Sequence, residues 1–313
     1  MPQTVIALGA HIFDVQVRPV EAIPPGQDAE LVEQIRFSPA GTAAGTAVTL
    51  AKLGATVRTA GAVGTDPIGD LLLSLLARYG VDTSLVVRRA EVQTSASVLP
   101  IRPDGSRPAF HVLGANLAYG PEDAPHAEIA QATHLHLGAP ELMGGENAAR
   151  ILAPARERGV ATSADLLAPG DPGLLDWIAP ALPHLDYLLP NDEQVLALTG
   201  APTLEDGVRS LLGRGVGCVA VTRGARGALV MTGQERFAVP AFAVEVVDTT
   251  GCGDAFSAGF LRGIGTGRPL REAAVLGCAA AALVAGGLGS DHGVFDLAAA
   301  DAFAASTPAL DAG

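Results

Sequence analysis

Short apolar runs alternate with amphipathic segments along most of the chain. The apolar runs have the length of buried strands, and the segments between them space their hydrophobic residues as helices do. The predicted strands of this series are Thr4–Leu8, Thr56–Ala60, Thr133–Leu137, Val160–Ala164, Tyr187–Leu189 and Val216–Thr222. The predicted helices are Thr42–Leu53, Ile68–Tyr79, Glu146–Arg158, Asp192–Leu198, Ala255–Ile264 and Leu270–Ala285. Repeated strand–helix units predict an α/β fold with a mostly parallel sheet and helices on both of its faces.

Two hairpins interrupt this alternation. Gln93–Ile101 and Arg107–Leu113 flank Pro103-Asp104-Gly105, a turn signal, and predict an antiparallel excursion from the main sheet. Ala228–Met231 and Glu235–Val239 predict a second hairpin. In parallel sheets ligands bind beyond the carboxyl ends of the strands, so the loops that follow the strands carry the functional information.

Composition narrows the class of protein. Hydrophobic residues make up 49% of the 313 residues and charged residues 17%, which argues against a disordered protein. The length suits one folded domain over residues 1–313, although two small domains are equally compatible. The net charge of −13 disfavours nucleic acid and anionic membranes as partners. Cys218, Cys252 and Cys278 are far apart, which argues against disulfides or a zinc site and favours a cytoplasmic location. The tail after Asp301 is expected to fray.

The segment Asp248–Phe256, with sequence D-T-T-G-C-G-D-A-F, holds the most informative chemistry. Gly251 and Gly253 permit a tight turn, and a helix is predicted directly after them. Free amides at a helix start form an anion site suited to phosphate. Asp254 could take a proton from a substrate hydroxyl, although a short glycine motif by itself favours a plain helix cap.

The same nine residues resemble the signature D-T-[TV]-G-A-G-D-x-[FY] of the PfkB, or ribokinase-like, carbohydrate kinases, with Cys252 as the single departure. The resemblance implies a three-layer α/β/α sandwich with a small β lid. It also implies an ATP- and Mg²⁺-dependent kinase that phosphorylates a hydroxyl of a sugar or sugar derivative. Asp254 would be the catalytic base, and the amides of Gly251, Cys252 and Gly253 would hold the transferred group. At a helix start the Cys252 thiol could also have a lowered pKa.

Two early segments resemble the family's sugar site. Asp14 follows the first strand, where the resemblance implies that a carboxylate binds substrate hydroxyls; a surface turn is the alternative. The eight residues from Ala40 resemble G-G-x-x-x-N-x-A, which implies that Gly41 and Gly45 line the sugar. Gly45 replaces the usual Asn, and Gly138 stands where some ribokinases carry Glu. Losing both polar contacts puts ribose itself in doubt.

The loop after the predicted strand Val216–Thr222 resembles the family's nucleotide loop. The resemblance implies that Thr222, Gly224, Arg226 and Gly227 contact ATP, although Arg226 also suits a plain hairpin turn. The helix Leu270–Ala285 would form a wall of the adenine pocket.

The same resemblance implies a segment that helps to bind magnesium. Pro190–Gln194 resembles the N-x-x-E motif that orients magnesium through water, with Asn191, Glu193 and Gln194 as candidates. Gln194 stands where Glu is expected, and an amide is a weaker partner for hydrated Mg²⁺. A monovalent cation near Asp248 also stays open.

Lid strands are expected from about residues 11–38 and 91–115, and they could pair two subunits into a homodimer. A nucleoside (adenosine-like) kinase and a non-catalytic ligand sensor on the same fold remain as alternatives, the second supported by Gln194 alone. Thr4–Leu8 is followed by a lone glycine, and no G-x-x-x-x-G-K-[ST] string occurs. A nicotinamide oxidoreductase and a P-loop NTPase are therefore excluded.

Overall fold

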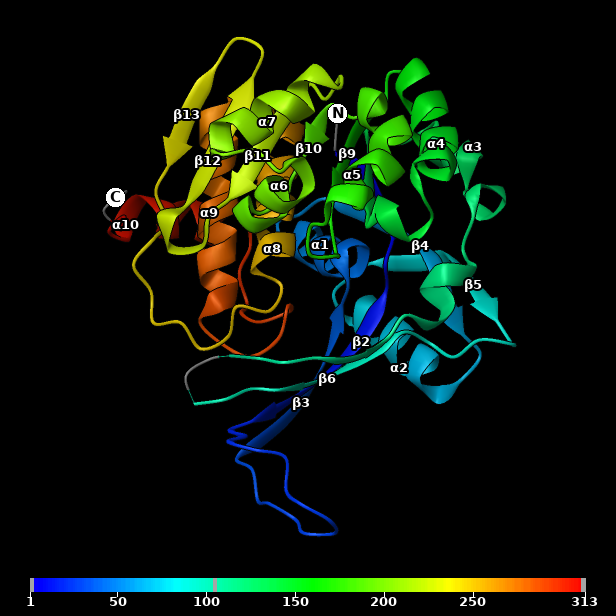
Figure 1. The fold of residues 1–313 in the computed structure, drawn as a ribbon, viewed down its shortest axis with the longest axis vertical. Coiled ribbons are helices and arrows are strands. Elements are labelled where there is room, and N and C mark those ends of the chain that lie inside the picture. The colour runs from blue at the N-terminus through cyan, green and yellow to red at the C-terminus, as the bar shows by residue number, and fades with distance from the viewer. Residues whose placement is uncertain (1–2, 104–105, 311–313) are drawn as a thin grey trace.

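The computed structural model describes residues 3–103 and 106–310, and its largest feature is a nine-stranded sheet (Figure 1). In spatial order its strands are β13 (Arg236–Val239), β12 (Ala228–Thr232), β11 (Cys218–Thr222), β10 (Tyr187–Leu188), β9 (Ala161–Asp165), β8 (His134–Gly138), β1 (Thr4–Gly9), β4 (Thr56–Gly64) and β5 (Asp82–Arg89). Strands β11 to β5 pair in parallel, whereas β12 is antiparallel to both of its neighbours. The mostly parallel sheet and the second hairpin are confirmed.

Helices cover both faces of this sheet and complete the three predicted layers. One face carries α3 (His126–Ile129), α4 (Gly145–Glu157), α5 (Pro172–Ile178), α6 (Asp192–Thr199) and α7 (Leu204–Gly213). The other carries α1 (Thr42–Lys52), α2 (Pro67–Arg78), α8 (Cys252–Gly265), α9 (Leu270–Ala285) and α10 (Leu297–Ser306). Within the described ranges, no helix has the length and apolar character needed to span a bilayer.

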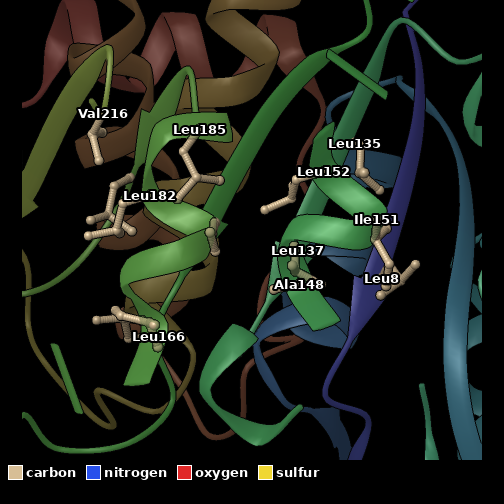
Figure 2. Close-up of a cluster of buried hydrophobic side chains, with 14 of the residues drawn as sticks. Leu8, Leu135, Leu137, Ala148, Ile151, Leu152, Leu166, Leu182, Leu185 and Val216 are labelled. Atoms are coloured by element: carbon tan, nitrogen blue, oxygen red, sulfur yellow. The ribbon is translucent and has the colours of Figure 1, made fainter. Parts of the chain in front are cut away.

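Strand alternation divides the core into two layers. In β1, Ile6 and Leu8 point toward α4, whereas Val5 and Ala7 point toward α1 and α8. Figure 2 shows the first layer, where leucines of β1 and β8 pack against α4. Because both faces of β1 are buried, its sequence is a continuous apolar run rather than an alternating one.

A second, four-stranded sheet projects from the main body (Figure 1). Its order is β3 (Gln34–Ala40), β2 (Ile12–Arg18), β6 (Ala96–Pro100) and β7 (Phe110–Val112). Strands β6 and β7 pair in antiparallel fashion, as the first hairpin pattern predicted. The turn expected at Pro103-Asp104-Gly105 falls partly outside the described residues.

The expectation that the chain frays after Asp301 is wrong up to residue 310; residues 311–313 lie outside the described residues. Helix α10 continues to Ser306, and Ala309 forms a β-bridge with Phe242. The Phe303 ring packs edge-on against Phe242 with centroids 5.5 Å apart. This part of the chain is ordered because the long-range contact buries an aromatic ring, which local spacing does not reveal.

Candidate active site

The turn before α8 lies beneath the second sheet and beyond the carboxyl ends of the central strands. Gly251 is the N-cap of α8 in a left-handed conformation (φ 74°), and a Cβ on it would lie 2.2 Å from Cβ of Ser290. Only glycine fits there without strain. The helix begins at Cys252, three residues earlier than predicted, which places Asp254 in its first turn.

The amides of this first turn face the site. A helix leaves its first four N–H groups without partners inside the helix, and its dipole favours an anion beside them. The Cys252 amide, one of the three amides predicted to bind the phosphoryl group, donates to the Thr249 carbonyl within the turn. At 3.3 Å this hydrogen bond is long and weak. The arrangement suits a bound phosphoryl group.

Asp254 is surrounded by groups that oppose its ionisation. Burial raises its pKa well above the ordinary value, and the negative charges of Asp165 and Asp14 raise it further. The Arg107 guanidinium acts in the opposite direction. A carboxylate with a raised pKa holds a proton more strongly, which suits a general base.

The predicted acceptor residues gather beside Asp254. A Cβ on Gly45, in α1, would lie only 2.3 Å from Oδ2 of Asp254, so the helix leaves room for the carboxylate. Gly41 caps α1 with φ 91°, and a Cβ there would lie 2.6 Å from the Ala10 carbonyl oxygen. Asp14 is buried on β2, and burial raises its pKa to about 6.

A pocket of about 250 Å³ lies next to the start of α8. Thr222, Gly224 and Gly227 line it together with Cys252, Gly253 and apolar residues of α9. Its apolar walls suit a flat aromatic base.

Two predicted features of this region differ in the structure. Arg226 does not line the pocket; its guanidinium forms an ion pair with Asp192 at the start of α6. The expected lowering of the Cys252 pKa is wrong, because burial raises it to about 12 and outweighs the helix start.

The metal candidates lie at the start of α6. Oδ1 of Asn191 accepts from the Gln194 amide, and Oε1 of Gln194 accepts from the Asn191 amide, a reciprocal capping box. Nε2 of Gln194 donates to the carbonyls of Leu166 and Ala168, at 3.0 and 2.9 Å. The buried amide of Gln194 thus fixes the loop after β9 through two donated hydrogen bonds, which a carboxylate could not donate. Glu193 is exposed.

Mg²⁺ fits the start of α6 through water and phosphate. Among the residues that the structure describes, no group of three or more His, Cys, Asp or Glu could hold a metal. Mg²⁺ usually keeps several waters and binds substrate phosphates, so a direct protein cage is not required.

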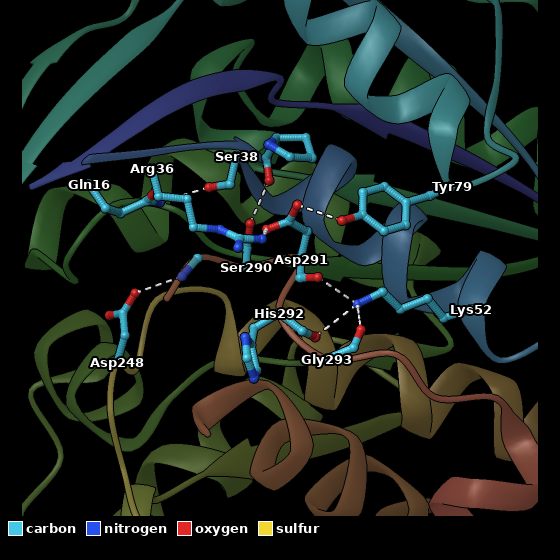
Figure 3. Close-up of polar contacts among 12 residues, drawn as sticks. Gln16, Arg36, Ser38, Lys52, Tyr79, Asp248, Ser290, Asp291, His292 and Gly293 are labelled. Carbon is cyan, nitrogen blue, oxygen red and sulfur yellow. Dashed lines mark hydrogen bonds and ion pairs between the residues drawn. The ribbon is translucent and has the colours of Figure 1, made fainter. Parts of the chain in front are cut away.

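The loop after α9 braces the Gly251 turn (Figure 3). Oδ1 of Asp248 accepts from the amide and hydroxyl of Thr250, and Oδ2 accepts from the amide of Gly289. Ser290, the next residue, is the one that abuts Gly251. These contacts fix the relative position of the two loops.

Lys52 holds the far end of the same loop (Figure 3). Its ammonium donates to the carbonyls of Asp291, His292 and Gly293 at 2.7, 2.8 and 2.8 Å. The Asp291 carboxylate in turn pairs with Arg36 of β3 at 2.7 Å. The loop thus links α1, the second sheet and the start of α8.

Three of these residues were missed as functional candidates. Asp165 ends β9, so the rule that sites follow strand ends could have found it. Arg107 belongs to the first predicted hairpin, and its Nε lies 3.9 Å from Oδ1 of Asp248. For Lys52 the sequence offers no functional indication beyond its place in Lys52-Leu53-Gly54, the segment that follows the glycine-rich segment around Gly45.

Comparison with known proteins agrees with this geometry. The pfkB family carbohydrate kinase model matches residues 3–294. The ATP-dependent ribose-1-phosphate kinase of Halopiger xanaduensis is 34% identical over 264 residues, covering 82% of this chain and 83% of that protein. The crystal structure of the Thermotoga maritima ribokinase is 25% identical, with a TM-score of 0.81 and coverage of 97% and 99%. A putative ribokinase II from E. coli, solved with ATP and Mg²⁺, shares the fold at 21% identity, with a TM-score of 0.83 and coverage of 97% and 99%.

The chain is an α/β phosphotransferase with the ribokinase-like fold. It belongs to the pfkB family of carbohydrate kinases. It is an ATP-dependent enzyme that phosphorylates a hydroxyl of a sugar or sugar derivative, and neither the nucleoside kinase nor the sensor alternative is favoured.

Proposed function

We propose that the chain transfers the γ-phosphoryl group of ATP to a pentose derivative, with Asp254 as the base. The observation that carries this is the Asp254 carboxylate in the first turn of α8, between the free amides and Gly45. Asp254 takes the proton of the attacking hydroxyl as the new O–P bond forms and the bond to ADP breaks. The amides from Gly251 to Gly253 receive the charge of the transferred group. Mg²⁺ bound to the phosphates supplies further charge neutralisation.

The pentose derivative is inferred from two observations. The relative with 34% identity acts on ribose 1-phosphate by its name. Gly45 and Gly138 lack the polar side chains that would select free ribose. A Cβ on Gly138 would lie 2.5 Å from the Ala43 amide nitrogen, so the neighbouring backbone leaves no room for a side chain at position 138. Asp14 remains as the buried carboxylate for acceptor hydroxyls.

The test is ADP release with MgATP against ribose 1-phosphate, ribose, deoxyribose, ketohexoses and nucleosides. We expect ribose 1-phosphate to give the highest kcat/KM, and Asp254→Asn to lose at least about a hundredfold. Asp176→Asn serves as control, since the Asp176 side chain on α5 is 86% exposed and pairs with Arg214, outside the site. Full activity of Asp254→Asn would overturn the base. A preference for a ketohexose or nucleoside would overturn the pentose derivative.

We also propose a homodimer formed through the second sheet. Phe37, Val15, Val98 and Phe110 lie directly opposite one another across its four strands. Phe37, Val98 and Phe110 are 51%, 44% and 61% exposed, an apolar stripe that a second copy would cover. Light scattering should give a dimer for the wild type and a monomer for Phe110→Ser. A monomeric wild type at micromolar concentration contradicts this.

The proposal also covers the cellular location of the protein and the dependence of its activity on a monovalent cation. The three free thiols support a reducing cytoplasm. Near Asp248, both carboxylate oxygens already accept protein hydrogen bonds. Comparing activity in K⁺, Na⁺ and tetramethylammonium buffers tests whether a monovalent cation adds to this arrangement, and an increase in K⁺ alone would support one.

A further inference from the structure

A row of polar side chains lies on the sheet face beneath α8, behind Asp254. His134 and His136 alternate along β8, and Ser163 and Asp165 alternate along the neighbouring β9. All four residues are at most 4% exposed. The rest of this layer is mainly apolar, and burying polar groups costs free energy unless they find partners.

The four side chains form a continuous chain of contacts. Oγ of Ser163 lies 2.7 Å from Nε2 of His134 and 2.9 Å from Nδ1 of His136. Nε2 of His136 lies 3.4 Å from Oδ1 of Asp165, a polar contact that does not amount to a hydrogen bond, and neither atom has a hydrogen-bond partner in the described part of the chain. Oδ2 of Asp165 lies 3.4 Å from the hydroxyl of Ser257, one turn of α8 after the base.

The Ser163 hydroxyl gives this chain a direction, because it can donate only one hydrogen bond. If it donates to Nδ1 of His136, the ring carries its proton on Nε2, facing Asp165. Burial lowers the pKa of His134 to about 3, so His134 is neutral and can donate its own Nε2–H to Ser163. The reverse direction would set a lone pair of His136 against the lone pairs of an Asp165 oxygen, which is repulsive. The first arrangement avoids this repulsion.

We propose that His136 is a positioning residue for phosphoryl transfer: its Nε2 edge contacts Oδ1 of Asp165 and holds that carboxylate facing the catalytic base. The inference rests on the proposed role of Asp254. Without the imidazole, the Asp165 carboxylate would lose its polar neighbour on this side and would be free to turn away from Asp254. Its charge would then act less on Asp254.

The charges around the base make this consequence measurable. Asp254 faces Asp165 from β9, Asp14 from β2 and Arg107 from the connection between β6 and β7. Asp165 faces the imidazole, the Ser257 hydroxyl and the buried Glu141, whose own pKa it raises. Asp165 is the charge that raises the pKa of Asp254 most. Moving this carboxylate away from Asp254 should therefore weaken the base.

The test compares His136→Leu with His136→Gln. The Leu variant has no donor, whereas Gln keeps a neutral N–H. kcat/KM for the acceptor is measured from pH 5 to pH 9 at saturating ATP and Mg²⁺, because this ratio reports the free enzyme. In the Leu variant the acid limb should move roughly one unit lower and the plateau should fall about tenfold. His136→Gln should keep the wild-type limb.

A loss of kcat/KM that is equal at every pH would show a purely structural role and overturn the proposal. So would a His136→Gln limb that moves as far as that of the Leu variant. If circular dichroism shows His136→Leu unfolded, Ser163→Ala replaces it; this variant should shift the limb in the same direction, and an unchanged limb overturns the proposal. If Asp254→Asn is inactive but the acid limb of His136→Leu does not move, the role of His136 is refuted while the proposed role of Asp254 stands.

Discussion

Replacing Lys52 by Met should destabilise the protein and impair phosphoryl transfer together. Lys52 is the single lysine of the chain. Its ammonium makes three hydrogen bonds to carbonyls of the loop after α9, and it lies over the rings of Tyr79 and Phe295 at 5.3 and 4.9 Å. Met keeps the apolar length of the side chain and removes the donor and the charge.

The structure sets the size of this effect. A hydrogen bond to a charged group contributes about 1.5–3 kcal/mol, so three would contribute roughly 5–9 kcal/mol if they simply added. They do not, because the ammonium loses hydration on burial, which lowers the pKa of Lys52 to about 8. We therefore expect Lys52→Met to lower the free energy of unfolding by about 3 kcal/mol, a value between the contribution of one such hydrogen bond and the sum of three. For a chain of this length that is a fall in Tm of roughly 4–6 °C.

Calorimetry and the kinase assay measure both effects. Arg209→Met is the matched control, because Arg209 is 61% exposed and pairs only with Asp206 on its own helix among the described contacts. Exposed pairs contribute about 0–1 kcal/mol, so this variant should stay close to wild type. kcat of Lys52→Met should fall, since Ser290 of the same loop abuts Gly251. A Tm for Lys52→Met within about 2 °C of the control would refute the reasoning.

Three further predictions concern the site. Gly45→Ala should lower kcat by about tenfold or more with a smaller effect on the KM for ATP, because its Cβ would displace the Asp254 carboxylate; steady-state kinetics checks this, and an unchanged kcat contradicts it. Gln194→Glu should lose about 1–3 kcal/mol in chemical denaturation, because a carboxylate cannot donate to two buried carbonyls; equal or higher stability would show that these two hydrogen bonds are unimportant. The KM for the acceptor should rise as pH falls through about 6, where Asp14 gains a proton and accepts hydroxyls less well. Because the folded pKa of Asp14 is raised, its contribution to stability declines as pH rises from about 4 to 6, so binding and stability should change in opposite directions.

The sequence by itself determined the layered fold and the central motif. Strand and helix periods are local properties, so β1, β8, β9 and most helices could be predicted from spacing alone. The Gly251 turn and Asp254 could be found for the same reason, because a tight turn and a helix start are encoded by adjacent residues. Strands β2 and β3 were covered only by a broad lid range.

Only the tertiary structure decided which distant side chains meet at Asp254. Asp165 lies 89 residues before Asp254 and reaches it because β9 stands near the centre of the sheet, beneath α8. Lys52 meets residues 291–293 across about 240 positions, and its role depends on backbone carbonyls, which have no sequence signature. Gln194 looked like a weakened metal contact because spacing predicts a residue's position but not its rotamer. Strand order and side-chain packing are long-range, and they set the charge around Asp254.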